Sequence, residues 1–594
     1  MKAYFLKMKL HLVFKIKYLN ENFKLKKMTL LNVNLEQYDA IVVGTGVSGG
    51  WAAKELCENG LKTLVLERGR MVKHVEDYPT MHLDPWDMPH GGATPSEILK
   101  DYDKQRRWGF DETKRHFYNK DSEHNYDEVK PFDWIRGKQV GGRSLIWGRQ
   151  TYRWSDLDFE ANAKDGHGVD WPIRYKDIAP WYDHVEKHIG ISGEALSLPH
   201  LPDSNFLPPM ELNCLETHLK ESIANSYEDR LMTIGRVAHI TQGSKEGAGR
   251  TACQFRNRCD RGCPFGAYFS SNSSTLPAAE ATGNMILRPN SIVAEVLYDE
   301  KTQKATGVRV VDALTKESIE FRSKIVFLCA SSMASTAILM QSKSNRFPNG
   351  MGNESGELGH NIMDHQLGSG ASGNYDGFND QYYSGRRPNG FYIPRFRNLG
   401  KGSKKVGFLR GYGYQGGAGR GNWSEAVSEL AYGKDFKNAV LEAGGWTLGM
   451  GGFGEVLPYH ENKMFLNYEK LDQYGLPTIV FDAEFKENER IMKEDWKIQA
   501  AEMLEDAGFK DVNIFDSNAP IGKGIHEMGT ARMGKDPKTS VLNKHNQIHG
   551  VPNVFVTDGA CMTSSANQNP SLTYMALTAR AANRAVAELK KQNL

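Results

Sequence analysis

The order of apolar and polar positions along the chain predicts alternating strands and helices near both termini. An apolar run at 40–43 is followed by a helix-like stretch at 51–58 and by a second apolar run at 63–66. Later, the run NVFVTDGA at 553–560 has the pattern of a buried strand, and apolar residues recur at helical spacing over 572–589. These patterns predict an α/β fold whose first unit is strand, helix, strand.

A glycine turn joins the first predicted strand to the helix. Gly44, Gly46 and Gly49 have the spacing GxGxxG, and Glu67 follows 18 residues after Gly49. Gly44 permits a tight turn, Gly46 lets the backbone approach a pyrophosphate, and Gly49 lets the helix pack closely on the strand. The helix N-terminus offers free N–H groups, and Glu67 is placed to accept hydrogen bonds from a ribose. The segment therefore predicts dinucleotide binding.

Two further segments have the character of a ligand site. Residues 137–149 read GKQVGGRSLIWGR, where the glycines permit close approach of a flat ligand and Trp147 would cover its face. Taken alone, this segment could equally be a surface turn. Asn569, Pro570 and Ser571 precede the predicted C-terminal helix, so a polar side chain, a proline and exposed N–H groups converge there.

Charge changes this picture only near the N-terminus. The 594 residues have a net charge of +2, from 74 Lys and Arg against 72 Asp and Glu. Residues 1–28 contain eight Lys and one acid, Glu21, so the rest of the chain is mildly acidic. We expect residues 1–36 to be a disordered basic segment, with an amphipathic membrane-surface anchor as the alternative. The near-neutral total excludes a protein dominated by nucleic-acid binding, and no apolar run is long enough to predict a membrane span.

Four motifs, taken together and in order, resemble those of the glucose-methanol-choline (GMC) oxidoreductases. They are the GxGxxG turn with LERG at 66–69, GGRSLIWG at 141–148, HEMGTARMG at 526–534, and TDGA followed by NP at 557–570. The resemblance spans residues 38–589. It implies an α/β fold, α+β overall, with a Rossmann-like FAD-binding domain and a substrate domain built on a mostly antiparallel sheet. It also implies oxidation of an alcohol carbon with hydride transfer to the flavin N5.

The resemblance implies roles for individual residues as well. His526 matches the family's catalytic histidine, and Asn569 matches its second polar catalytic position. Some relatives carry a histidine in the flavin-side loop that bonds covalently to FAD; Ile146 takes that place here, so we expect non-covalent FAD. The residues that match FAD contacts are Gly44, Gly46, Gly49, Glu67, Gly141, Gly142, Ser144, Trp147, Val293, Asp558, Gly559 and Thr573.

The two catalytic positions suit alcohol oxidation. A neutral imidazole at His526 can take the hydroxyl proton, because its unperturbed pKa is about 6.5. Asn569 can hydrogen-bond the same hydroxyl and hold the C–H toward the flavin. We interpret His545 and His549 as structural. We interpret His365, in GHNIMDH, in the same way, with a place in the substrate pocket as the alternative.

Three of the seven cysteines form a cluster with the spacing C-x5-C-x3-C: Cys253, Cys259 and Cys263. Four arginines in the same segment (Arg250, Arg256, Arg258 and Arg261) would offset thiolate charge. The close thiols favour a [3Fe-4S] or [4Fe-4S] cluster, while structural zinc or a disulfide with one spare thiol are the alternatives. The segment also resembles the cysteine region of bacterial FAD-dependent sugar dehydrogenases, namely the catalytic subunits of the glucose, gluconate 2- and glucoside 3-dehydrogenases. That resemblance implies a small partner subunit and a cytochrome or quinone acceptor.

These expectations combine into a dehydrogenase that oxidises a secondary hydroxyl of a sugar or glycoside, with C3 of glucosides favoured. A gluconate or polyol dehydrogenase and a non-catalytic electron-transfer flavoprotein are the alternatives. Localisation is open between the periplasm, by export with a partner subunit, and the cytoplasm. The expected domains are an FAD-binding domain at 37–345, which includes an insert at 71–136 and the cysteine loop at 250–270, a substrate-binding domain at 346–515, and a second FAD-binding part at 516–594.

Overall fold

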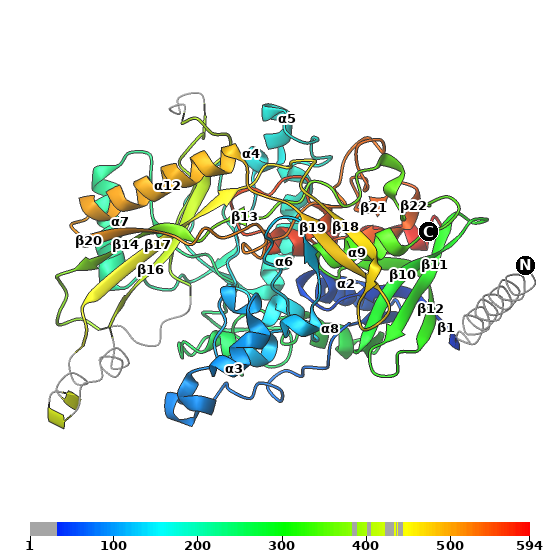
Figure 1. The fold of residues 1–594 in the computed structure, drawn as a ribbon, viewed down its shortest axis with the longest axis horizontal. Helices are drawn as coiled ribbons and strands as arrows, with labels where there is room; N and C mark the ends of the chain where they lie inside the picture. The colour runs from blue at the N-terminus through cyan, green and yellow to red at the C-terminus, as the bar shows by residue number, and fades with distance from the viewer. Residues whose placement is uncertain (1–31, 383–388, 401–405, 422–432, 435, 438–442) are drawn as a thin grey trace, which may run out of the picture.

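The computed structural model describes residues 32–382, 389–400, 406–421, 433–434, 436–437 and 443–594. Figure 1 shows two large sheets side by side, one built mainly from parallel strands and one from antiparallel strands. The expected fold class is therefore confirmed. Among the described residues, no helix is long and apolar enough to cross a membrane.

The first sheet has parallel strands at its centre. Strand β1 pairs in parallel with β2 on one side and with β12 on the other, and β9 extends the sheet beyond β2. Strand β22, from the C-terminal part of the chain, pairs in parallel with the end of β12. Strands β10 and β11 add an antiparallel extension. The bounds are β1 Asn32–Val43, β2 Thr63–Leu66, β9 Met285–Arg288, β10 Ser291–Asp299, β11 Lys304–Asp312, β12 Ser318–Leu328 and β22 Val551–Val556.

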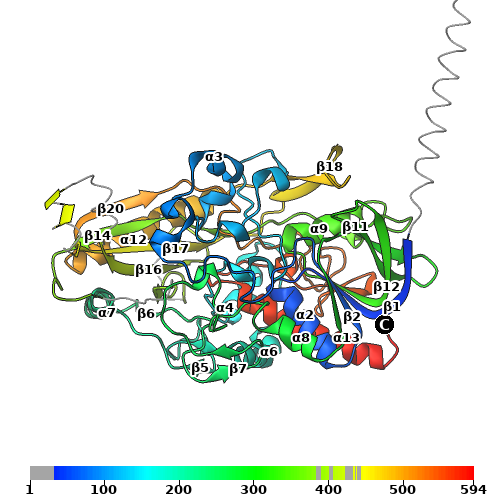
Figure 2. The ribbon, with the colours of Figure 1, turned by 90° about the horizontal axis from the view of Figure 1, so that it is seen from below.

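Helices from both ends of the described chain cover one face of this sheet. Helix α2 (Val47–Glu58) packs against α8 (Thr275–Ala281) and α13 (Ser571–Lys590), which also packs on α6 (Tyr175–Ile189). Figure 2 shows α2, α8 and α13 beside β1 and β2. The interface is a core of small residues such as Ala52, Ala53 and Ala582, which lets the backbones approach closely. The predicted strand at 63–66 is confirmed residue for residue, and the predicted C-terminal helix is confirmed within one residue at each end.

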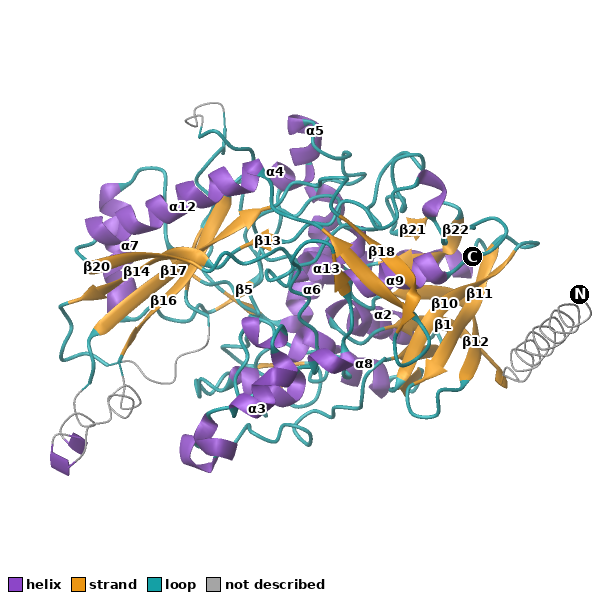
Figure 3. Ribbon diagram, in the orientation of Figure 1, coloured by secondary structure: helices purple, strands orange, loops and turns teal. Residues whose placement is uncertain are grey.

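The second sheet is antiparallel, in the order β20-β14-β17-β16-β15-β6, with β13 paired to β17. Helices α7 and α12 share one hydrophobic core with it, and they are visible at the left of Figure 3. Trp446, Leu448 and Met450 of β17 belong to that core. The bounds are β6 Thr233–Ile234, β13 His365–Gln366, β14 Ser369–Tyr375, β15 Phe391–Ile393, β16 Tyr412–Arg420, β17 Trp446–Glu455, β20 Lys510–Asp516, α7 Cys214–Ser226 and α12 Glu487–Asp506.

The insert at 71–136 consists mostly of loops and turns, and most of its helices are short 3-10 helices. Its strand β3 (Asp127–Glu128) joins a third sheet with β18 (Lys463–Leu471) and β19 (Pro477–Asp482). Strand β1 begins at Asn32, which lies inside the segment expected to be disordered; the rest of that basic segment, residues 1–31, lies outside the described residues. Helix α9 (Ser332–Gln341) follows β12 directly.

Candidate functional site

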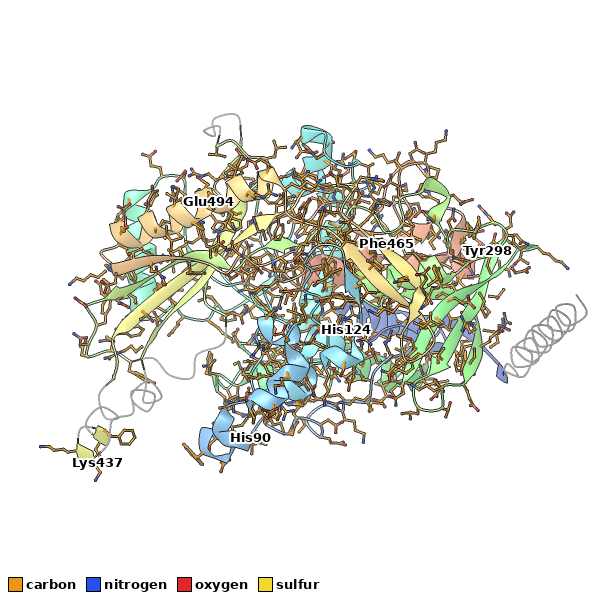
Figure 4. All side chains as sticks on the ribbon, in the orientation of Figure 1. His90, His124, Tyr298, Lys437, Phe465 and Glu494 are labelled. Carbon is orange, nitrogen blue, oxygen red and sulfur yellow. The ribbon has the colours of Figure 1, made fainter. Side chains whose placement is uncertain are left out.

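A large cavity, here called the main cavity, lies where the first sheet, the insert and the C-terminal segments meet. It encloses about 2130 Å³ of space between atoms, part of which is open to solvent. Its wall includes the glycine turn after β1, the end of β2, the start of α9, the 472–479 part of the β18–β19 hairpin, and residues 525–527. His124 of the insert, labelled in Figure 4, also lines it. The site therefore draws on segments spread over the whole fold.

The glycine turn opens into this cavity as the motif predicts. Gly44 has φ +98°, and a Cβ there would lie 2.4 Å from the Cys329 carbonyl oxygen. A Cβ on Gly46 would meet no atom within 4 Å, so Gly46 borders open space at the start of α2. Gly49 has the opposite environment, because a Cβ there would lie 1.9 Å from the Gly44 carbonyl oxygen. A dinucleotide phosphate would thus find exposed N–H groups beside Gly46.

Glu67 ends β2 and lines the same part of the main cavity. Its Oε2 accepts hydrogen bonds from the Thr45 backbone N–H at 3.1 Å and from the Thr45 hydroxyl at 2.5 Å. Its Oε1 accepts one from the Gly69 N–H at 3.0 Å. Burial raises the pKa of Glu67, although these hydrogen bonds oppose the shift. Besides facing the expected ribose position, Glu67 therefore holds the glycine turn in place.

The wall of the main cavity carries buried polar atoms that have no hydrogen-bond partner among the described residues. The Arg136 guanidinium is one case, since its Nη1 has no partner and burial lowers its pKa to about 10. The others are His124 Nε2, Trp134 Nε1, Arg149 Nε and Nη1, and Tyr574 Oη. Buried donors without partners are costly unless a ligand satisfies them. Donors of this kind beside a dinucleotide turn fit a polar ligand with phosphate groups, as FAD is.

Most residues expected to contact FAD line the main cavity, but three do not. Gly49 packs under the turn, and a Cβ on Gly141 would lie 1.7 Å from Asn272 Oδ1. The Thr573 hydroxyl is buried against the Tyr182 hydroxyl at 2.8 Å. The residues that line it are Gly44, Gly46, Glu67, Gly142, Ser144, Trp147, Val293, Asp558 and Gly559.

Asp558 is held rigidly at the start of a short 3-10 helix. Its Oδ1 accepts a hydrogen bond from the Ala560 N–H at 3.0 Å, and its Oδ2 accepts one from the Ser335 hydroxyl at 2.5 Å. Burial raises the pKa of Asp558 to about 6. Because Ser335 lies on α9, the carboxylate ties the C-terminal segment to the helix that follows β12.

At another part of the cavity wall, His526 and Asn569 come together as expected. The Nε2 of His526 lies 3.5 Å from Nδ2 of Asn569. On its other side, Nδ1 of His526 lies 2.8 Å from Nδ1 of His365. The Nε2 of His365 lies 2.9 Å from the Ala566 carbonyl oxygen. His365 is therefore behind the imidazole of His526 and does not line the main cavity.

These contacts determine which nitrogen of His526 is unprotonated and can act as a base. A carbonyl oxygen only accepts, so the His365 Nε2 facing Ala566 carries the hydrogen. Burial lowers the pKa of His365 to about 4, so its Nδ1 is an acceptor at neutral pH. The Nδ1 of His526 must then donate, which leaves the Nε2 lone pair facing Asn569. Burial, His365 and Arg143 all lower the pKa of His526 below its usual range.

The backbone around His526 is held by a buried carboxylate. Asp364, the neighbour of His365, accepts hydrogen bonds from the N–H groups of Gly522, Gly524 and His526 at 2.8, 2.8 and 2.9 Å. Burial raises the pKa of Asp364 to about 7. These roles of Asp364 and His365 were not predicted, because the residues Met363, Asp364 and His365 carry no spacing signal for a partner some 160 residues away.

The cysteine loop differs from its expected arrangement. The pKa of Cys259 is raised to about 12, mainly by burial; Arg149 opposes the shift, and the neighbouring thiols of Cys253 and Cys263 contribute to it, so the three thiols are near neighbours. However, no three His, Cys, Asp or Glu side chains in the part of the chain described here are arranged to hold a metal ion. Among the described residues, the three thiols are therefore not arranged around a single metal ion.

Three of the four arginines in the cysteine loop have hydrogen-bond partners in the insert. The guanidinium groups donate to backbone oxygens of the insert: Arg256 to Met81 at 2.5 Å, Arg258 to His82 at 3.2 Å, and Arg261 to Leu83 at 3.0 Å. Arg258 also pairs with Asp84. We call these contacts the arginine clamp. Arg250 does lie near Cys263, but its N–H groups bond to backbone oxygens and the Ser274 hydroxyl.

Comparison with known proteins places this architecture in a family. The GMC oxidoreductase models match residues 38–367 and 458–578. The chain is 27% identical over 577 residues to 2-methyl-1,2-propanediol dehydrogenase of Mycolicibacterium austroafricanum, covering 93% of this chain and 95% of the relative. It is 25% identical over 578 residues to the fructose dehydrogenase large subunit of Gluconobacter japonicus, covering 93% and 98%.

A solved structure agrees in fold. The formate oxidase of Aspergillus oryzae RIB40 superposes with a TM-score of 0.60 at 15% identity, covering 94% of this chain and 99% of that one. The chain therefore belongs to the GMC oxidoreductases, and it is an FAD-dependent oxidoreductase that acts on CH–OH groups.

Proposed function

We propose that this protein oxidises a secondary hydroxyl of a sugar or glycoside, with C3 of a glucoside as the favoured position. The observation that carries the proposal is the unprotonated Nε2 of His526 beside the Asn569 amide on the wall of the main cavity. A gluconate or polyol dehydrogenase with the same machinery is the second candidate. A non-catalytic electron carrier would have no use for a base directed in this way.

The residues act in one step on the bound alcohol. The hydroxyl proton passes to Nε2 of His526, and the emerging negative charge on the substrate oxygen is stabilised by an N–H of Asn569. FAD supplies the acceptor for the hydride that leaves the carbon, so the C–O bond becomes a carbonyl. The imidazolium that forms keeps its Nδ1–H directed at His365, which holds the ring in orientation during the transfer.

The names of two relatives support the substrate class. One contains a sugar, fructose, and the other a diol, so both describe oxidation of hydroxyl-bearing carbon. The aromatic residues at 411–420 give the substrate class no direct support, because Tyr412 and Tyr414 are buried in the core beneath the sheet. Trp147, which lines the main cavity, remains available to a ring face.

A substrate panel tests this proposal. Purified holoenzyme would be assayed with methyl α-D-glucopyranoside, D-glucose, D-fructose, D-gluconate and 2-methyl-1,2-propanediol, with dichlorophenolindophenol as acceptor, with and without oxygen. We expect turnover of a sugar or glycoside with the dye, and analysis of the product identifies the oxidised carbon. His526→Ala should keep its flavin and lose dye reduction with every substrate. Turnover of the diol alone, or an active His526→Ala variant, would refute the proposal.

For the cofactor and the electron acceptor, the proposal rests on the sequence and the relatives' names. We propose non-covalent FAD, because Ile146 stands in the flavin-side loop; acid precipitation should release all of the flavin. We propose a partner subunit and a cytochrome or quinone acceptor, supported by the words "large subunit" in a relative's name. We propose a cluster on Cys253, Cys259 and Cys263 only from their spacing. Iron, sulfide and EPR analysis of anaerobically purified protein tests it, and less than about one iron per chain would refute it.

A further inference from the structure

Strand β16 presents to the C-terminal segment a face on which only Gln415 has a side chain. Successive side chains along a strand point to opposite faces of the sheet. Tyr412 and Tyr414 point toward α12, where their hydroxyls donate to Asp495 Oδ2 at 2.5 Å and to the Trp496 carbonyl oxygen at 2.7 Å. Positions 413, 417 and 419, which share the face of Gln415, are all glycine. Nothing else from the middle of this strand can therefore reach the site.

Gln415 makes a direct contact with the second catalytic position. Its Nε2 donates to Oδ1 of Asn569 at 2.6 Å, a short distance for an amide pair. Since Oδ1 is engaged there, Nδ2 of Asn569 is the atom turned to Nε2 of His526, at 3.5 Å. Hydrogen bonds thus run in one direction from Gln415 through Asn569 and His526 to His365 and the Ala566 carbonyl.

We propose that Gln415 is a positioning residue that fixes the orientation of the Asn569 carboxamide during alcohol oxidation. In the observed orientation Asn569 offers an N–H to the substrate oxygen while the hydroxyl proton moves to His526. The reverse orientation would turn the lone pairs of Oδ1 toward the same oxygen as it becomes negative, which opposes the reaction. The inference rests on the roles proposed above for His526 and Asn569.

Two substitutions that keep the length of the Gln415 side chain test its hydrogen-bonding role apart from its shape. Gln415→Met keeps the length of the side chain but removes the N–H donor. Gln415→Glu replaces the donor with an acceptor and favours the reversed Asn569 amide. We expect kcat to fall about tenfold in Gln415→Met and about a hundredfold in Gln415→Glu, with flavin content and KM changed less than twofold. Tyr414→Phe, the next residue on the strand, is the control: it should lower the melting temperature and leave kcat unchanged.

A double-mutant cycle shows whether Gln415 acts through Asn569. In an Asn569→Ala background, Gln415→Met should cause no further loss of kcat, because the amide that it orients is absent. A full tenfold loss in that background, or unchanged kcat in both Gln415 single variants, would overturn the proposal. A loss of kcat that matches a loss of bound flavin would also overturn it, since the role would then be structural.

A measurement without substrate keeps this test separate from the proposed function. The absorbance of bound flavin would be titrated with acid, so that a change reports ionisation of groups beside it, including His526. The added carboxylate of Gln415→Glu should raise the midpoint by about one pH unit, because it stabilises the imidazolium, whereas Gln415→Met should not. Equal midpoints in all three proteins would overturn the proposal. If no alcohol reduces the wild-type protein, the proposed function fails, but this titration still decides the role of Gln415.

Discussion

Replacing His365 tests whether the tautomer of His526 is set from behind the ring. In His365→Leu the Nδ1–H of His526 would lose the one hydrogen-bond acceptor that the described residues give it, which lies at 2.8 Å in the wild type. The Nε2 side toward the cavity would be unchanged. A buried donor left without a partner costs about 1–3 kcal/mol. Because the imidazolium formed in the reaction needs that acceptor most, we assign this cost to the transition state. At about 1.4 kcal/mol per factor of ten, kcat should fall about 5- to 150-fold.

The assay is steady-state dye reduction together with flavin content and melting temperature. His365→Asn is the matched variant, since its amide oxygen can take the place of the Nδ1 acceptor. It should therefore recover most of the kcat lost in His365→Leu. The reasoning would be refuted if His365→Leu kept kcat within about twofold of the wild type, or if the Leu and Asn variants were equally slow at equal flavin content.

Three further predictions concern the base, the glycine turn and the insert. The pKa of His526 lies below its ordinary value of 6.5. We therefore expect kcat/KM to stay constant as the pH falls from about 8 and to decline only below about 6.5, when the base becomes protonated. A pH–rate profile with an apparent pKa of 7 or above would contradict this. Gly46→Ala should fold normally but bind flavin weakly. Gly49→Ala should lose about 3 kcal/mol of unfolding free energy, because its Cβ would lie 1.9 Å from the Gly44 oxygen. Equal melting temperatures of the two variants would contradict this difference. Arg258→Ala should cost less than about 1 kcal/mol and should raise hydrogen exchange at 81–84; unchanged exchange there would show that the clamp does not hold the insert.

The parts of the site predicted from the sequence are those that backbone geometry dictates locally. The GxGxxG turn between a strand and a helix is set by local backbone geometry, so Gly44, Gly46 and Glu67 could be placed from spacing and context. His526 and Asn569 were placed by resemblance of motifs. His365 and Gln415 could not be found in either way, because their roles come from contacts with residues 161 and 154 positions away in the chain. Pairing of that kind is decided by how two sheets meet, which no local pattern encodes.

For the arginines of the cysteine loop, a local pattern suggested one kind of partner, and the structure shows another. A cluster of cations beside thiols suggested an electrostatic role, yet a guanidinium has five donors and can satisfy backbone carbonyls just as well. The insert at 81–84 presents such carbonyls in a row, and three arginines bind there. The sequence therefore does not determine which acceptor an arginine binds.

The course of the chain through the first sheet has a consequence for biosynthesis. Strand β22 and helix α13 complete a sheet and a helix layer that begin with β1 and α2, some 500 residues earlier. The same late segment, residues 551–590, carries Asp558 and Asn569. During synthesis, helix α2 can pack against α13 only after residues 551–590 have left the ribosomal exit tunnel. Flavin capture is therefore expected to come after translation of this segment, and a nascent chain stalled before it should expose the apolar faces of α2 and β12 to chaperones.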